Sequence, residues 1–162
     1  MAEGKKRLYK RETVEKIFNE LRERVMFVNY NGHIQKVKDV IVFGSFINSD
    51  KSMVHDLDVL YVLYPRDHKN DRLERQIAAN RMFERRPFSN VSYFELSYYP
   101  ENEVYWYLKN KNGIISLHSG SDIKAAVYQK HVYLMKDGEY LYEPLECEGT
   151  GEKIEQTNPI EW

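Results

Sequence analysis

Two short polar motifs, each joined to an apolar run, are the residues whose types and spacing could do chemistry. Gly44-Ser45 ends the apolar run 40–43, and Asp56 and Asp58 open a second apolar run after a ten-residue gap. Glycine lets the backbone approach a phosphate closely, and serine adds a hydroxyl. Two aspartates one residue apart on a strand point to the same side, where a hard divalent cation would offset their repulsion. The stretch therefore predicts a phosphate-binding turn beside a pair of metal-binding carboxylates.

The elements that must position these motifs alternate between helix and strand. Apolar residues at three- and four-residue steps predict a helix over 13–28, and the run 37–43 predicts the first strand. Residues 44–55 predict a polar loop. Residues 57–64 are nearly all apolar, which predicts a second strand buried on both faces.

The second half of the chain continues this alternation. Residues 68–85 predict a helix, and the alternation over 91–99 predicts the third strand. A helix is predicted over 101–111 and a short one, capped by Ser121 or Asp122, through Gln129. The turn residues 136–139 between two apolar runs predict a hairpin.

This order predicts one α/β (α+β) domain over residues 1–146. It would be a small mixed β-sheet flanked by helices, with a C-terminal β-hairpin. Residues 147–162 are rich in glycine and glutamate and predict a flexible C-terminal tail.

Bulk composition excludes several classes of protein. With 162 residues, 42% of them hydrophobic, the chain suits one globular domain, and no apolar stretch is long enough to span a bilayer. The net charge of −1 gives no global signature of nucleic-acid binding. The single cysteine, Cys147, excludes an internal disulfide and fits a cytoplasmic location. The basic N-terminus has no apolar segment behind it and is not that of a signal peptide.

The paired motifs resemble the signature of the DNA polymerase β-like nucleotidyltransferase superfamily, and the small size resembles its minimal branch. That signature is a hydrophobic residue, Gly-Gly or Gly-Ser, a spacer, and Asp-hydrophobic-Asp-hydrophobic; residues 43–45 and 56–59 match it. The resemblance covers residues 37–64 firmly and the order of elements to about residue 99. The chain departs from it at residues 46–48 and His55, where relatives often carry glycine, arginine or serine.

The resemblance implies a fold, an activity and a site. Gly44 and Ser45 would bind the β- and γ-phosphates of a nucleoside triphosphate, chiefly ATP. Asp56 and Asp58 would bind two Mg²⁺ ions that promote transfer of the nucleoside monophosphate to an acceptor hydroxyl. Family members usually carry a third carboxylate on the next strand, and Glu95 is the acid within the third predicted strand; an outward-facing surface position is its alternative interpretation.

Other polar residues have weaker signals. His118 lies in the polar run 116–121, which resembles an active-site loop, although no second ligand spacing supports zinc. His55 could contact a phosphate or the acceptor, or be an ordinary loop histidine beside a carboxylate. The arginines of the 68–86 segment are mixed with glutamates, which favours a solvated helix face over an RNA contact.

Three function classes stay open at this point. The first is a nucleotidyltransferase acting on a protein, an RNA or a small molecule. The second is a catalytically weak or inactive antitoxin-like regulatory module that binds a helical partner protein, for which the aromatic cluster 105–107 is a candidate contact surface. The third is an enzyme that modifies a small molecule such as an antibiotic, with a homo-oligomer completing the site.

Overall fold

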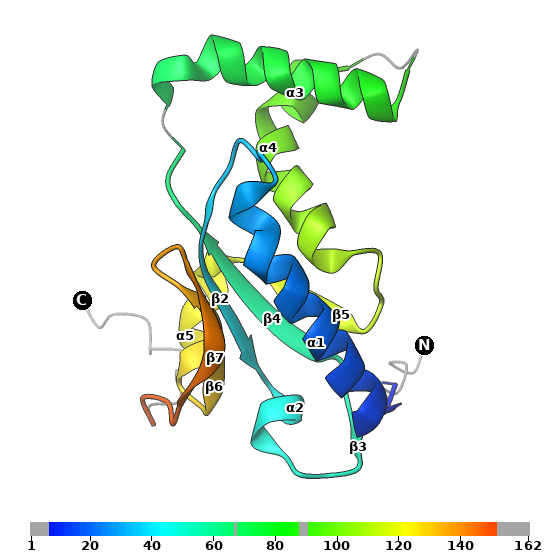
Figure 1. Cartoon of the computed structure of the whole chain (residues 1–162), viewed down its shortest axis with the longest axis vertical. Coiled ribbons are helices and arrows are strands. Elements are labelled where there is room, and N and C mark those ends of the chain that lie inside the picture. Colours follow the sequence, from blue (N-terminus) through cyan, green and yellow to red (C-terminus); the bar gives the residue numbers. More distant parts are fainter. Residues whose placement is uncertain (1–6, 67, 88–90, 152–162) are drawn as a thin grey trace, which may run out of the picture.

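A mixed five-stranded sheet lies at the centre of the computed structural model, which describes residues 7–66, 68–87 and 91–151 (Figure 1). Its strand order is β5-β4-β2-β6-β7. Neighbouring strands are antiparallel except β4 and β5, which are parallel. The strands are β2 (Val37–Phe43), β4 (Leu57–Leu63), β5 (Ile115–His118), β6 (His131–Lys136) and β7 (Glu139–Cys147). A separate two-stranded ribbon pairs β1 (Tyr9–Lys10) with β3 (Met53–Val54).

Helices cover both faces of the sheet. The helices are α1 (Arg11–Phe27), α2 (Ser45–Asn48), α3 (Asp71–Arg85), α4 (Tyr93–Lys109) and α5 (Ile123–Val127), with 3₁₀ turns η1 (Val28–Tyr30), η2 (His68–Asn70) and η3 (Gly120–Asp122). Apolar residues of α1 and α4 pack with Val42 and Val59 on one face. Ala126 of α5 packs with Ile41 and Leu60 on the other. Both faces of β2 and β4 are therefore buried, as their apolar sequences predict.

Several sequence predictions are confirmed. The predicted strand 37–43 is β2, the predicted strand 57–64 is β4, and the helices predicted over 13–28 and 68–85 correspond to α1 and α3. The hairpin is β6 and β7, joined by Asp137 (φ 51°) and Gly138 (φ 82°). Positive φ at both central residues is what a type I′ turn requires. The predicted mixed sheet flanked by helices is confirmed as well.

The prediction of a third strand over 91–99 is wrong. These residues begin α4, because the hydroxyl of Ser92 caps the helix by accepting from the backbone N–H of Glu95 (3.1 Å). The helix continues through Pro100 to Lys109 and buries Tyr99 and Val104. This burial offsets the backbone hydrogen bond that proline removes. The strand that follows β4 in the sheet is instead β5, only four residues long, which no sequence pattern predicted.

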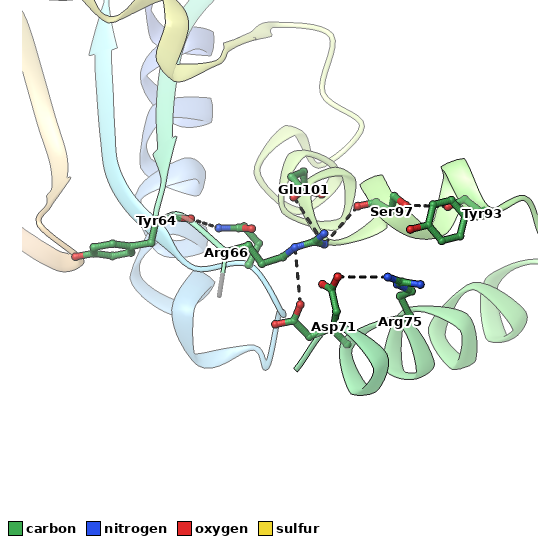
Figure 2. Close-up of polar contacts among 9 residues, drawn as sticks. Tyr64, Arg66, Asp71, Arg75, Tyr93, Ser97 and Glu101 are labelled. Atoms are coloured by element: carbon green, nitrogen blue, oxygen red, sulfur yellow. Dashed lines mark hydrogen bonds and ion pairs between the residues drawn. The ribbon is translucent and has the colours of Figure 1, made fainter. Parts of the chain in front are cut away.

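An arginine in the connection that follows β4 links this connection to α3 and α4 (Figure 2). Arg66 lies 3.8 Å from a carboxylate oxygen of Glu74 on α3 and 3.9 Å from one of Glu101 on α4. It also donates to the backbone carbonyl of Ser97 (3.3 Å). The Arg66 and Glu74 side chains are only 18% and 17% exposed, so this contact is shielded from water. The α3–α4 pair is thereby joined to this connection by charge as well as by the chain itself.

The chain beyond β7 remains attached to the domain up to residue 151. The backbone N–H groups of Thr150 and Gly151 donate to the carbonyls of Val127 (3.1 Å) and Tyr128 (3.0 Å) at the end of α5. The boundary predicted at residue 147 therefore falls inside hydrogen-bonded structure, and residues 152–162 of the predicted tail lie outside the described residues. Within the described part of the chain, no helix combines the length and apolarity needed to cross a bilayer.

Candidate functional site

The structure brings the glycine turn and the second aspartate into direct contact. Gly44 follows β2, and the register of β2 and β4 pairs Phe43 with Asp58. Gly44 has φ 84° and ψ −161°, a backbone conformation that is essentially restricted to glycine. A Cβ added to Gly44 would lie 3.1 Å from Cγ of Asp58 and would clash with its Oδ2. Glycine is needed here for two reasons, the backbone conformation and the close approach of a carboxylate.

The segment after Gly44 is folded back on itself. Ser45 begins α2, and its hydroxyl accepts from the backbone N–H of His55 (3.3 Å). The Gly44 carbonyl accepts from the backbone N–H of Asn48 (2.9 Å), whose side-chain amide also donates to the Lys130 carbonyl (2.9 Å). The predicted loop 44–55 is therefore an ordered connection that contains a helical turn and a short strand, and the two halves of the motif are bonded to each other.

An arginine at the N-terminal end of α1 holds this segment in place. Arg11 donates to the backbone carbonyls of Phe46 (3.0 Å), Ser49 and Lys51 (2.7 Å). Its guanidinium also lies over the Phe46 ring, 5.3 Å from the ring centre. The sequence shows Arg11 only as one of several N-terminal cations, so nothing in its spacing predicts this role.

The two aspartates lie at the start of β4. Asp56 directly precedes the strand and Asp58 is its second residue; both are half-buried. Oδ1 of Asp58 lies 3.1 Å from Nε2 of His118 on β5, and Ser116 Oγ lies 3.3 Å from the same nitrogen. A carboxylate only accepts hydrogen bonds, so Nε2 of His118 carries the proton and donates to Asp58.

His118 is the site residue that the sequence motif missed. Its ring lies 5.2 Å from the Phe43 ring, and its Nδ1 lies 3.8 Å from a carboxylate oxygen of Asp122. The side chain is 31% exposed, comparable to 27% for Asp58. Sixty residues separate the two partners, and only the parallel pairing of β5 with β4 brings them together. The polarity of residues 116–121 was the one signal for it in the sequence.

Glu95 does not join this site. It lies in the first turn of α4, where its carboxylate forms an ion pair with Arg86. Its assignment depended on a third strand over 91–99, and that segment is helical. Among residues 7–66, 68–87 and 91–151, no group of three or more histidine, cysteine, aspartate or glutamate side chains is placed to hold a metal ion.

Two carboxylates still fit Mg²⁺ carried by a nucleotide. Mg²⁺ keeps several waters and commonly takes only one or two protein carboxylates together with substrate phosphates. Asp56 and Asp58 would supply these, and the absence of a side chain at Gly44 lets the Asp58 carboxylate lie against the backbone of the turn. An open cavity of about 780 Å³ adjoins the turn and is lined by Ser45, Lys51 and His55 among others. Its hydroxyls and its cation suit a phosphate chain.

Comparison with known proteins adds no identity: no family model, no curated protein and no solved structure matches this chain.

Proposed function

We propose that this protein is a Mg²⁺-dependent nucleotidyltransferase that transfers a nucleoside monophosphate from a nucleoside triphosphate, ATP first among them, to an acceptor hydroxyl. The acceptor oxygen would bond to the α-phosphorus and lose its proton, while the bond to the β-phosphate breaks and pyrophosphate leaves. The proposal depends on the likeness of residues 43–59 to the nucleotidyltransferase signature. The observation that supports it most is the contact between Gly44 and the Asp58 carboxylate, because a phosphate-binding turn and a metal-binding acid must be adjacent for this chemistry.

Each site residue has a defined part in this proposal. Gly44 and Ser45 bind the terminal phosphates, while Asp56 and Asp58 bind Mg²⁺. Bound Mg²⁺ would supply charge neutralisation at the phosphates and activation of the acceptor oxygen. His118 orients the Asp58 carboxylate by donating to Oδ1, which leaves Oδ2 as the oxygen beside Gly44.

Label transfer from ATP marked at its α-phosphate tests the proposal. The acceptors offered are the protein itself, RNA and a small-molecule extract, each with and without Mg²⁺. We expect Asp56→Asn and Asp58→Asn to abolish labelling while the fold is kept. Two matched controls remove a carboxylate elsewhere: Asp50→Asn, on the exposed loop between the motifs, and Glu95→Gln on α4. Both controls should keep full labelling. If the Asp58→Asn variant labelled an acceptor as well as these controls do, the proposed role of Asp58 would be refuted.

A second candidate function follows from β5. The resemblance implies a third carboxylate on the strand after the aspartate pair, and the strand beside β4 carries Ser116 and His118 there instead. This favours a module that binds nucleotide and a helical partner protein without transfer. Mg²⁺-ATP would then raise the melting temperature by linkage but leave no label on any acceptor. Absence of both effects would refute both functions.

A further inference from the structure

A cavity of about 430 Å³ lies between the C-terminal end of α3 and the N-terminal half of α4. This volume is within the range of small-molecule sites, roughly 300–1,000 Å³. The α3–α4 pair lies at the opposite end of the molecule from α2, and so away from the Gly44–Asp58 contact (Figure 1). The nucleotidyltransferase proposal uses none of its lining residues, and the cavity needs an explanation of its own.

Four aromatic rings line this cavity. Phe94 and Tyr98 pack against each other with ring centres 4.7 Å apart and an angle of 54° between the ring planes, and Tyr99 meets Trp106 edge to face at 5.7 Å. Three of the four remain open to solvent, with Phe94 70%, Tyr98 51% and Trp106 40% exposed. Rings held in place by each other present flat faces with little conformational freedom to lose on binding. They suit a planar ligand that stacks on them.

The charged side chains that line the cavity indicate the charge of that ligand. Arg86 is neutralised by Glu95. The Arg85 guanidinium lies over the Trp106 ring, 4.3 Å from its centre, and interacts with the Tyr99 hydroxyl and with the Glu103 carboxylate. Glu103 already forms an ion pair with Arg81, so the two arginines share one carboxylate. Arg81, Arg85 and Glu103 together therefore leave a net charge of +1, with Arg85 beside an aromatic face of the cavity. A single anionic group attached to a flat ring complements both features.

We propose that the α3–α4 cavity binds a small planar aromatic ligand that carries one negative charge. The ring stacks on the exposed aromatic wall and the anionic group pairs with Arg85. The amide of Asn102, which also lines the cavity, offers a donor and an acceptor to ring heteroatoms. A single-stranded nucleic acid is the less favoured occupant, because it needs a track of cations. Two further arginines near this end of the molecule, Arg66 and Arg81, are already paired with glutamates.

The probe is nicotinate, with nicotinamide as its neutral counterpart of nearly equal shape. The chain has two tryptophans, so the full-length Trp162→Phe variant leaves Trp106 as the sole tryptophan reporter. We expect nicotinate to change Trp106 fluorescence saturably and to bind at least about tenfold more tightly than nicotinamide. That factor is about the contribution of one charged hydrogen bond.

Variants test whether nicotinate binds in the α3–α4 cavity. Arg85→Gln should weaken nicotinate binding about tenfold and bring it to the nicotinamide level. Arg85→Lys keeps the charge and should retain part of the affinity, which guards against a simple folding defect. Arg72→Gln removes an exposed charge from the same helix outside this cavity and should change nothing.

Three results would overturn the proposal. The first is no saturable fluorescence change with nicotinate. The second is that nicotinate and nicotinamide bind with equal affinity, or that the Arg85→Gln variant binds nicotinate as tightly as the protein with Arg85 does. The third is quenching by a single-stranded oligonucleotide and not by nicotinate, which would identify a nucleic-acid surface instead. None of these outcomes bears on Asp56 or Asp58, so the cavity and the nucleotidyltransferase proposal fail or stand separately.

Discussion

Replacing Gly44 with alanine is the sharpest test of the geometry at the candidate site. The added Cβ would occupy a backbone conformation that is restricted to glycine and would meet the carboxylate of Asp58. A strained φ/ψ pair of this kind costs about 1–3 kcal/mol. Overpacking by one methyl group costs about 1–3 kcal/mol more. We therefore expect Gly44→Ala to lower the free energy of unfolding by about 2–6 kcal/mol.

Urea denaturation measures this loss, and two other glycines separate its parts. Gly113 has open space around its Cα and no positive φ, so Gly113→Ala should change the free energy of unfolding by less than about 0.5 kcal/mol. Gly32 has φ 71° and only a flexible arginine tip 3.7 Å from the added Cβ, so Gly32→Ala should show backbone strain alone. The excess cost at Gly44 over Gly32 then reports the contact with Asp58 together with any additional backbone strain from ψ −161° at Gly44.

A double-mutant cycle checks the same contact. Combined with Gly44→Ala, Asp58→Ala removes the clashing oxygen but leaves the strained backbone, so the two changes should couple by about 1–3 kcal/mol. If Gly44→Ala were as stable as Gly113→Ala, the turn would not adopt this conformation. The close approach of backbone and carboxylate would then be refuted, and with it the main support for the proposed function.

Three further predictions concern the frame around the site. Burial raises the pKa of the Glu103 carboxyl above its usual 4.5, and its ion pair with Arg81 offsets only part of this effect. The folded state therefore binds that proton more tightly. Relative to Glu103→Gln, the wild type should lose stability as the pH rises from about 4.5. Melting temperatures of both proteins at several pH values measure this, and parallel curves of melting temperature against pH would contradict it. Gly138→Ala should destabilise the hairpin, because the new Cβ would lie 2.7 Å from the Tyr64 hydroxyl at φ 82°; an unchanged urea midpoint would disprove that contact. Ser92→Ala should lower the free energy of unfolding by about 1 kcal/mol through loss of the α4 cap, and no loss would mean that the cap is not formed.

Local patterns predicted much of the fold because they depend on short-range physics. Continuous apolar runs specified β2 and β4, and positive-φ turn residues specified the hairpin. The segment 91–99 failed because its alternation of aromatic and polar residues suits a strand as well as a helix. The helix is stabilised by the capping hydrogen bond of Ser92 and by the burial of Tyr99 against α3.

At the candidate site, too, some features follow from local sequence and others from tertiary packing. The sequence by itself determined which side chains are present. It also determined that Gly44-Ser45 follows one apolar strand and that the Asp56/Asp58 pair lies at the start of the next. Those choices depend on residue type and on strand periodicity, both of which are local. The spacing even implied that turn and acids would be neighbours.

Only the tertiary structure decided which third residue joins them. A strand four residues long has too little sequence to be recognised, yet its parallel pairing with β4 places His118 beside Asp58. Glu95, chosen from local alternation, is carried by α4 to the end of the molecule where it pairs with Arg86. Contacts across sixty residues are set by how the elements pack, and no local pattern encodes that arrangement.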